Sequence, residues 1–239
     1  MFDHVTIRVS DLEASRRFYR TVLGREPEGD EFLEWDEFSI APVENDRPVT
    51  RHLHVAFAAA SRPEVDAFWR RGVDGGYESD GDPGPRPQYS PDYYGAFLLD
   101  PDANSVEAVH GSPRTESGPS IDHLWLGVAD LEASRRFWTT VAPVLGLQVE
   151  DSRLPGLVVV AGHRSHLMLV PGRAPTENLH VAFPVPDDEA VAEFHRVATG
   201  AGYPDNGAPG ERSQYHPGYV GAFVLDPDGN NVEAVNHDR

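Results

Sequence analysis

Short stretches in which apolar and polar positions alternate, or in which β-branched and aromatic residues cluster, recur along the chain and predict β-strands. Side chains on a strand point alternately to its two faces, so each stretch can turn an apolar face to a core. These stretches cover residues 4–9, 32–35, 37–43 and 52–58, then 157–160, 166–170 and 180–183. Near residues 100 and 226, an Asp-Pro-Asp-x-Asn segment between two β-rich runs predicts a strand, a turn and another strand.

A different spacing, with inward-facing residues three or four positions apart, predicts helices between the strands. Asp11 is placed to cap the first helix and Gly24 to end it. The inward face of this helix consists of Leu12, Ser15, Tyr19 and Val22. A second helix is started by Pro63, because proline is favoured in the first turn, and its inward face consists of Val65, Phe68 and Trp69. The second half repeats both helices, the later one over residues 188–198.

Internal repetition dominates the organisation of the chain. The segment DLEASRRF occupies residues 11–18 and returns unchanged at residues 130–137. Likewise GAFLLDPDANSVEAV at residues 95–109 returns as GAFVLDPDGNNVEAV at residues 221–235. The repetition predicts one duplicated domain, with a first copy at residues 1–111 and a second at residues 120–239. The residues between them, 112–119, belong to a stretch rich in Gly, Pro and Ser that is typical of a linker.

The order of elements within each copy indicates the fold class. A strand, a helix and several strands follow one another twice in each half. We therefore expect an α+β protein of two tandem domains, each made of two βαβββ modules that form a curved mixed sheet with the helices outside.

Two segments break this regularity and carry candidate binding residues. Residues 81–94 (GDPGPRPQYSPDYY) and 207–219 (GAPGERSQYHPGY) hold too much Pro and Gly for regular structure, yet are laden with Arg and Tyr. Such loops are often binding loops, so we expect a lid with these substrate-contacting residues: Arg86, Tyr89, Tyr93, Arg212, Tyr215 and His216. Tyr219 is the candidate for proton transfer. The alternative is a packed loop whose arginines meet local acids.

Composition and charge narrow the function classes. The chain has 239 residues, a formal net charge of -19 and no cysteine, which excludes disulfides and thiolate chemistry. Nucleic acids and anionic membranes require a positive surface, so neither is expected as a partner. No apolar run approaches the roughly 18 residues of a membrane span, and no secretory signal is visible, so a cytoplasmic location is expected. The expected partner is a small-molecule substrate, and a homodimer is left open.

Histidine and glutamate residues at matching points of the repeat suggest metal binding. Two imidazoles and one carboxylate, with further positions open, suit a divalent first-row metal that binds substrate or dioxygen directly. Grouped by halves, the candidate ligands are His4, His54 and Glu107, then His123, His180 and Glu233. A single histidine or glutamate of this kind could equally be structural or solvated, whereas repetition of all three favours ligands.

The tandem βαβββ pattern resembles the vicinal oxygen chelate superfamily, which includes glyoxalase I, bleomycin-resistance proteins and type I extradiol dioxygenases. The resemblance is carried by the strand-initial His before a DLEAS-type helix, by the strand HVAF and by the DPDGNxVE hairpin, and it extends over nearly the whole chain. It implies that the same six residues are the metal ligands. It also implies a substrate with two adjacent oxygens that the metal chelates.

Three activities within this superfamily remain open. Similarity to extradiol dioxygenases implies Fe(II) and makes His166 the candidate base, although Phe223 stands where that family has an acid tyrosine. Similarity to glyoxalase I implies a lyase or isomerase with Ni, Zn, Co or Mn and a fourth ligand, for which Glu37 and His166 are the only candidates. A drug- or metabolite-binding protein related to bleomycin-resistance proteins is the non-catalytic alternative. The dioxygenase-like enzyme is the first choice.

Overall fold

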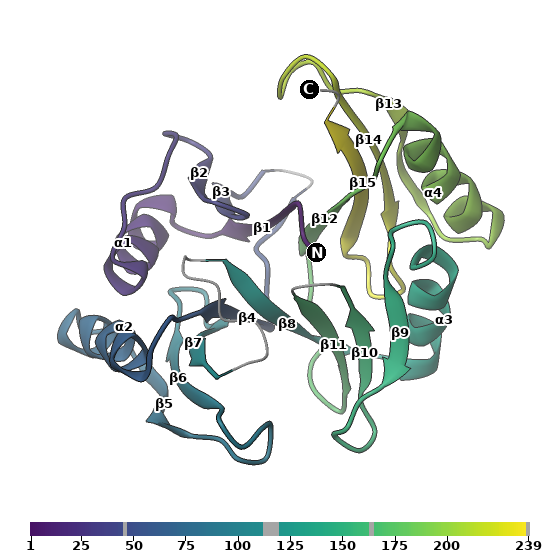
Figure 1. The fold of residues 1–239 in the computed structure, drawn as a ribbon. Coiled ribbons are helices and arrows are strands. Elements are labelled where there is room, and N and C mark those ends of the chain that lie inside the picture. Colours follow the sequence, from purple (N-terminus) through teal and green to yellow (C-terminus); the bar gives the residue numbers. More distant parts are fainter. Residues whose placement is uncertain (45–46, 112–119, 163–164, 238–239) are drawn as a thin grey trace. The chain divides into compact units, whose positions relative to one another are not determined.

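The computed structural model describes residues 1–44, 47–111, 120–162 and 165–237 (Figure 1). The predicted linker at residues 112–119 lies outside the described residues. Across the described ranges, every helix is too short or too polar to cross a membrane.

The chain divides into two compact units, each of which includes a short piece from the other half. One unit comprises Thr6–Trp125, and the other comprises Leu126–Arg239 together with Met1–Val5. We call them the Thr6 unit and the Leu126 unit. The boundaries fall inside the two strands that begin the repeats, β1 (His4–Val9) and β8 (Ile121–Val128).

The strands form two mixed sheets, which together with four helices confirm the predicted α+β class. The seven-stranded sheet has the order β13-β14-β15-β12-β1-β3-β2, and the eight-stranded sheet has the order β5-β6-β7-β4-β8-β11-β10-β9. The remaining strands of the first repeat are β2 (Leu33–Trp35), β3 (Phe38–Pro42), β4 (Leu53–Ala58), β5 (Ser79–Pro85), β6 (Tyr94–Leu99) and β7 (Ser105–His110). Those of the second are β9 (Gln148–Asp151), β10 (Val158–Ala161), β11 (His166–Pro171), β12 (His180–Pro184), β13 (Asp205–Glu211), β14 (Tyr219–Leu225) and β15 (Asn231–His237).

The helices begin where the sequence places their caps. In α1 (Leu12–Leu23) the Asp11 carboxylate accepts from the Ala14 N–H, and Gly24 ends the helix at a left-handed φ of 68°. Ser61 caps α2 (Arg62–Asp74), in which Pro63 lies in the first turn as expected. Asp130 and Asp187 cap α3 (Leu131–Val141) and α4 (Asp188–Gly200).

Aromatic side chains fill the space between the helices and the sheets. In the Thr6 unit Phe18 and Tyr19 on α1 are fully buried, and Tyr19 packs against Phe38 at 4.9 Å between ring centroids. In the Leu126 unit Trp138 on α3 packs edge-on against Phe183 of β12 at 5.7 Å. These cores hold the strands that carry the candidate ligands.

Two segments predicted to be irregular loops are partly strands, so that prediction was wrong. Residues 79–85 form β5 and residues 205–211 form β13, each at the end of its sheet and paired antiparallel with the following strand. Both pairings contain register shifts, at Gly81 and at Gly207. Bulged edge strands tolerate Gly and Pro, because fewer of their backbone groups need sheet partners. The Arg- and Tyr-bearing parts that follow remain turns.

A buried asparagine in each hairpin connects the strand that carries a candidate glutamate to the strand that carries a candidate histidine. Asn230, 1% exposed, accepts the Leu179 N–H through Oδ1 at 3.0 Å and donates to Asp226 through Nδ2 at 3.1 Å. Asn104 repeats these contacts with Leu53 and Asp100. Because Leu179 precedes His180 and Leu53 precedes His54, this asparagine fixes where each of these two histidine strands begins.

Replacing Asn230 with Ala should lower the free energy of unfolding by about 1–3 kcal/mol, because the buried Leu179 N–H and the Asp226 carboxylate lose their partner. Urea denaturation of the variant and the wild type measures this. Asn206→Ala removes an exposed side chain of the same type, whose Nδ2 bonds Asn231, and should change stability by less than about 0.5 kcal/mol. Equal stability of the wild type and Asn230→Ala would show that the hairpin does not depend on this side chain.

Candidate metal centres

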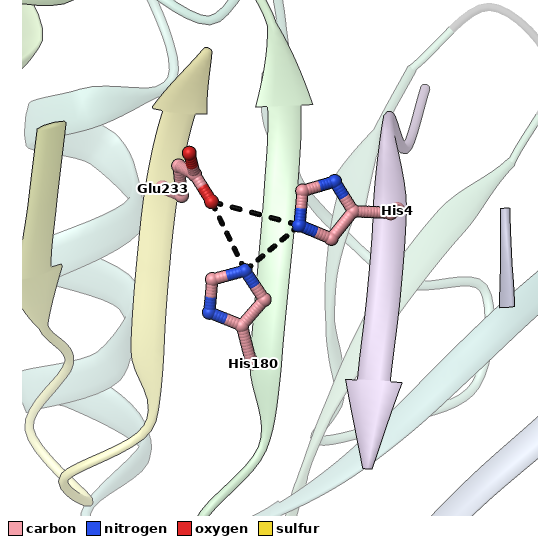
Figure 2. Close-up of side chains that lie close together, drawn as sticks. All are labelled: His4, His180 and Glu233. Carbon is pink, nitrogen blue, oxygen red and sulfur yellow. Dashed lines mark hydrogen bonds and ion pairs between the residues drawn. The ribbon is translucent and has the colours of Figure 1, made fainter. Parts of the chain in front are cut away.

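The first cluster of candidate ligands lies in the Leu126 unit and combines His4, His180 and Glu233. Figure 2 shows the three side chains converging from β1, β12 and β15. His180 Nε2 is 3.0 Å from Glu233 Oε2 and 2.9 Å from His4 Nε2, and His4 Nε2 is 3.6 Å from the same carboxylate oxygen. Strand β12 pairs parallel to β15 with Ala182 opposite Glu233, which brings His180 and Glu233 to one face.

The second cluster lies in the Thr6 unit and combines His54, Glu107 and His123 from β4, β7 and β8. His54 Nε2 is 3.0 Å from Glu107 Oε2 and 3.3 Å from His123 Nε2, and His123 Nε2 is 3.5 Å from the same oxygen. The two clusters are thus nearly identical in their donor distances, as the repeat requires.

The grouping of ligands by halves is wrong for the first histidine of each repeat. His4 joins the histidine and glutamate of the second repeat, and His123 joins those of the first. The physical reason is the strand order: β1 neighbours β12, whereas β8 neighbours β4. Each unit nevertheless holds one complete cluster of two histidines and one glutamate, because Met1–Val5 belongs to the Leu126 unit and residue 123 to the Thr6 unit.

An aspartate next to each first histidine fixes the imidazole. Asp3 Oδ1 lies 2.8 Å from His4 Nδ1, and Asp122 Oδ1 lies 2.7 Å from His123 Nδ1. A carboxylate that accepts the Nδ1–H leaves the Nε2 lone pair facing the cluster, which is the arrangement that a metal ligand needs. Sequence analysis missed both aspartates, although the repeated Asp-His pair at residues 3–4 and 122–123 was a usable signal.

A tyrosine holds the second oxygen of each glutamate. The Tyr219 hydroxyl donates to Glu233 Oε1 at 2.6 Å, and the Tyr93 hydroxyl donates to Glu107 Oε1 at 2.7 Å. Burial raises the pKa of both tyrosines, and the neighbouring carboxylate raises it further. The phenols therefore stay protonated and leave Oε2 of each glutamate directed at the histidines.

Charge is concentrated in the buried Thr6-unit cluster. Burial raises the pKa of Glu107, but hydrogen bonds from His123 and His54 outweigh it and lower that pKa to about 2. Burial lowers the pKa of His123, but hydrogen bonds with Asp122 and Glu107 outweigh it and raise that pKa to about 9. In the Leu126 unit burial raises the pKa of Asp3, but its hydrogen bonds and charge interactions with His4 and His237 outweigh burial and lower that pKa.

The donor set of each cluster fits a divalent metal ion. Separations of 2.9 to 3.6 Å between the three donor atoms allow all three to lie about 2 Å from one ion, the usual distance for His and carboxylate ligands. Two facing Nε2 atoms beside a carboxylate also need a cation between them, either a proton or a metal. Two histidines and one carboxylate leave coordination positions for a substrate.

Of the predicted lid residues, Tyr93 reaches a cluster through its hydrogen bond to Glu107, whereas the others pack locally. Arg86 donates to the Asp82 carbonyl and lies 5.4 Å over the Phe97 ring, and Arg212 repeats this with Ala208 and Phe223. Tyr89 contacts the Tyr93 ring at 5.0 Å between centroids, and Tyr215 contacts the Tyr219 ring at the same distance. His216 is hydrogen bonded to His237. The role of these residues in substrate binding stays a prediction.

Among the described residues, the remaining candidates, His166, Glu37 and Phe223, belong to neither cluster. His166 begins β11 in the eight-stranded sheet, whereas His180 and Glu233 belong to the seven-stranded sheet. Glu37 accepts the Ile121 N–H at 2.9 Å. Phe223 lies opposite Glu233 in the β14–β15 pairing, with its ring 6.2 Å from that of His180. His166 is thus apart from His180 and Glu233 in the strand order, although β11 neighbours β8, which carries His123; its role as base or fourth ligand stays a prediction.

The two clusters differ in accessibility. The side chains of His4 and His180 are 25% and 22% exposed, whereas those of His54 and His123 are 11% and 3% exposed. Near the His54 cluster, the ring centroid of Trp125 on β8 lies 5.7 Å from that of His54 and 5.5 Å from that of Tyr89, and the repeat puts Thr6 at the corresponding position of β1, the strand that carries His4. Only the Leu126-unit cluster thus presents substantial imidazole surface among the described residues.

Comparisons with known proteins agree with the repeat and the fold. A family model for the Glyoxalase/Bleomycin resistance protein/Dioxygenase superfamily matches residues 1–108 and again residues 120–234. Glyoxalase I from Zea mays is similar in structure, with a TM-score of 0.68 and 20% identity over 99% of this chain and 92% of that one. A putative dioxygenase from Bacillus subtilis has a TM-score of 0.69 and 13% identity over 100% of this chain and 85% of that one. These structural likenesses concern the fold alone. No curated protein matches the sequence.

Proposed function

Since the chain belongs to the Glyoxalase/Bleomycin resistance protein/Dioxygenase superfamily, we propose that it is a metal-dependent enzyme acting on a small substrate with two adjacent oxygens. The observation that carries this proposal is the cluster of His4, His180 and Glu233, whose donor atoms face one point and whose imidazoles are partly exposed. The reaction we assign first is dioxygenase-type cleavage of a catechol, because two histidines and one carboxylate with open positions are typical of non-haem Fe(II) oxygenases.

The residues of the chain have separate roles in this proposal. His4, His180 and Glu233 would hold the metal, which supplies a positive centre that binds adjacent substrate oxygens and stabilises the negative charge developing on them. Asp3 keeps the Nε2 lone pair of His4 available, and Tyr219 holds Glu233 through Oε1. Tyr219 is thus a positioning residue in this proposal. The Phe223 ring lies 6.2 Å from that of His180 between centroids and has no proton to offer a substrate.

A second candidate is a lyase or isomerase that moves a proton next to a carbonyl without redox chemistry. Two observations favour it. Phe223 cannot act as the acid that extradiol dioxygenases use, and among the described residues His166, the candidate base, belongs to neither cluster. The absence of a fourth His, Asp or Glu donor from both clusters, among the described residues, weighs against a four-ligand glyoxalase site.

Metal analysis of protein purified without chelator, combined with oxygen measurements, separates these candidates. Iron, with oxygen uptake in the presence of a catechol, would support the dioxygenase. Zinc or nickel, with oxygen-independent turnover of a carbonyl substrate that carries an adjacent hydroxyl, would support the lyase. Protein that binds none of these metals when they are supplied would overturn both and favour a drug- or metabolite-binding protein.

We expect up to two metal ions per chain, because each unit holds a complete set of donors. Titration with Zn²⁺ of protein stripped by chelator measures the stoichiometry. His180→Ala should remove one ion and His54→Ala the other, each leaving the second cluster intact. A wild-type protein that never binds more than one ion per chain would show that one cluster is held together by a proton instead.

A further inference from the structure

A series of hydrogen bonds connects His4 to the loop before β14, entirely within the Leu126 unit. His4 Nδ1 is bonded to Asp3 Oδ1 at 2.8 Å, and Asp3 Oδ2 is bonded to His237 Nε2 at 2.9 Å. His237 Nδ1 is in turn 2.9 Å from His216 Nε2, and His216 Nδ1 is 2.8 Å from the Pro217 carbonyl. Both carboxylate oxygens of Asp3 are therefore hydrogen bonded, Oδ1 to His4 and Oδ2 to His237.

The two outer histidines, His216 and His237, each direct a ring nitrogen at an acceptor. The Pro217 carbonyl can only accept, so His216 Nδ1 carries a proton. An ionised Asp3 also only accepts, so His237 Nε2 carries one as well. His216 Nε2 faces His237 Nδ1, so His216 holds the His237 ring from the side away from Asp3.

His237 also contacts the residue that orients Glu233. Its ring meets the Tyr219 ring edge-on at 5.1 Å between centroids, and it stacks on His216 at the same distance. Tyr219 donates to Glu233 Oε1. One side chain therefore supports two of the three candidate ligands, His4 through Asp3 and Glu233 through Tyr219.

The Thr6 unit lacks this support. The repeat puts Ser90 at the position of His216 and Gly111 at that of His237. The Ser90 hydroxyl donates to the Gly111 carbonyl at a long 3.4 Å. Asp122, the counterpart of Asp3, is 2% exposed, and its Oδ2 has no hydrogen-bond partner among the described residues. The two clusters thus have the same ligands but different supporting groups.

We propose that His237, backed by His216, is a positioning residue that holds Asp3 and Tyr219 for metal binding at the His4 cluster and has no equivalent at the His123 cluster. This inference rests on the proposed function, because it assumes that the clusters bind metal. Loss of His237 should free Asp3 Oδ2, loosen the orientation of His4 and weaken metal binding at that cluster alone.

The test uses two parent variants, each of which keeps only one complete cluster, so that metal binding at each cluster is measured separately. His123→Ala leaves only the His4 cluster complete, and His180→Ala leaves only the His123 cluster complete. Zn²⁺ affinity is measured in each background by competition with a chelating dye at fixed pH. In the His123→Ala background, adding His237→Ala should weaken Zn²⁺ binding about tenfold, the lower end of the effect of losing an outer partner of a ligand.

Matched variants separate positioning from simple loss of packing. His237→Gln keeps an N–H donor for Asp3 and should restore affinity to within about threefold of the parent. His216→Ala should have a smaller effect than His237→Ala, because His216 does not contact Asp3 directly in the hydrogen-bond series. In the His180→Ala background both His237→Ala and Ser90→Ala should leave affinity unchanged. Thermal midpoints of all variants verify that they are folded.

The outcomes distinguish the proposed metal function from the proposed role of His237. If neither background binds Zn²⁺, the proposed metal function fails. If both bind Zn²⁺ but His237→Ala changes neither affinity, or weakens both equally, the metal function stands and the inference about His237 is overturned. Failure of His237→Gln to restore binding, with a folded protein, would also overturn it.

Discussion

Replacing Glu233 with Gln is expected to lower metal affinity at the His4 cluster by more than about 100-fold and to reduce turnover of an identified substrate to a similar degree. Loss of a ligand should exceed the effect of losing one of its outer partners, which is typically 10- to 100-fold. The amide keeps the size of the side chain and an oxygen that can accept from Tyr219, so the fold should persist. Metal content and kcat of the purified variant measure the result.

Glu107→Gln is the matched control, because Glu107 has the same kind of environment: 1% exposed, bonded to a tyrosine and flanked by two histidines. It should remove the other ion. Comparing turnover of the two variants then assigns catalysis to one cluster, and we expect the larger loss with Glu233→Gln. A Glu233→Gln protein that retains two ions and full turnover would rule out Glu233 as a ligand.

The metal-free protein is expected to lose stability as the pH rises from about 6.5 to about 9. The folded-state pKa of His123 is about 9, above its ordinary value of 6.5, so the folded state binds more protons in this range. Its contribution is complete below pH 6.5 and disappears as the pH approaches 9, and is on the order of 1–3 kcal/mol. Urea midpoints in the presence of chelator, measured from pH 6 to pH 9.5, test this.

Glu107 gives the opposite dependence on the acid side. Its pKa is lowered from 4.5 to about 2, so its contribution is complete above pH 4.5 and is lost as the pH falls toward 2. Saturation with Zn²⁺ should flatten the profile between pH 6.5 and 9, because the ion replaces the proton on His123 and metal binding there releases a proton. A metal-free protein whose stability is constant over that range would contradict the charged His123.

Local physics explains which parts of the fold could be predicted from the sequence. Asp11 and Asp130 cap helices because their carboxylates can reach backbone N–H groups three residues away, and no distant contact is needed. The strand carrying His180 and the hairpin carrying Glu233 were predictable for the same reason. The edge strands β5 and β13 were not, because Gly and Pro are tolerated there only when the neighbouring strand supplies the pairing.

The six candidate ligands could be predicted from the sequence, but which three of them form each cluster could not. The repeat identifies His4 and His123 as equivalent positions. It does not show whether each histidine shares a cluster with the ligands of its own repeat or with those of the other repeat. Only the strand order decides between them. Asp3 and Asp122 could have been found from the repeated Asp-His pair. The position of Tyr219 against Glu233 could not, because it depends on the register of β14 against β15.

Because His4 shares a cluster with ligands of the second repeat, the two clusters become complete at different times during translation. The Thr6-unit cluster takes its last donor from residue 123, so its three donors have all been synthesised once translation has passed that residue. The other cluster joins residue 4 to residue 233, so its first ligand must wait until residue 233 has been synthesised. During that interval His4 and Asp3 have no partner strand β12, and pairing over such a sequence distance is slow because a long loop must close. Translation thus completes the more buried cluster first and the more exposed one last.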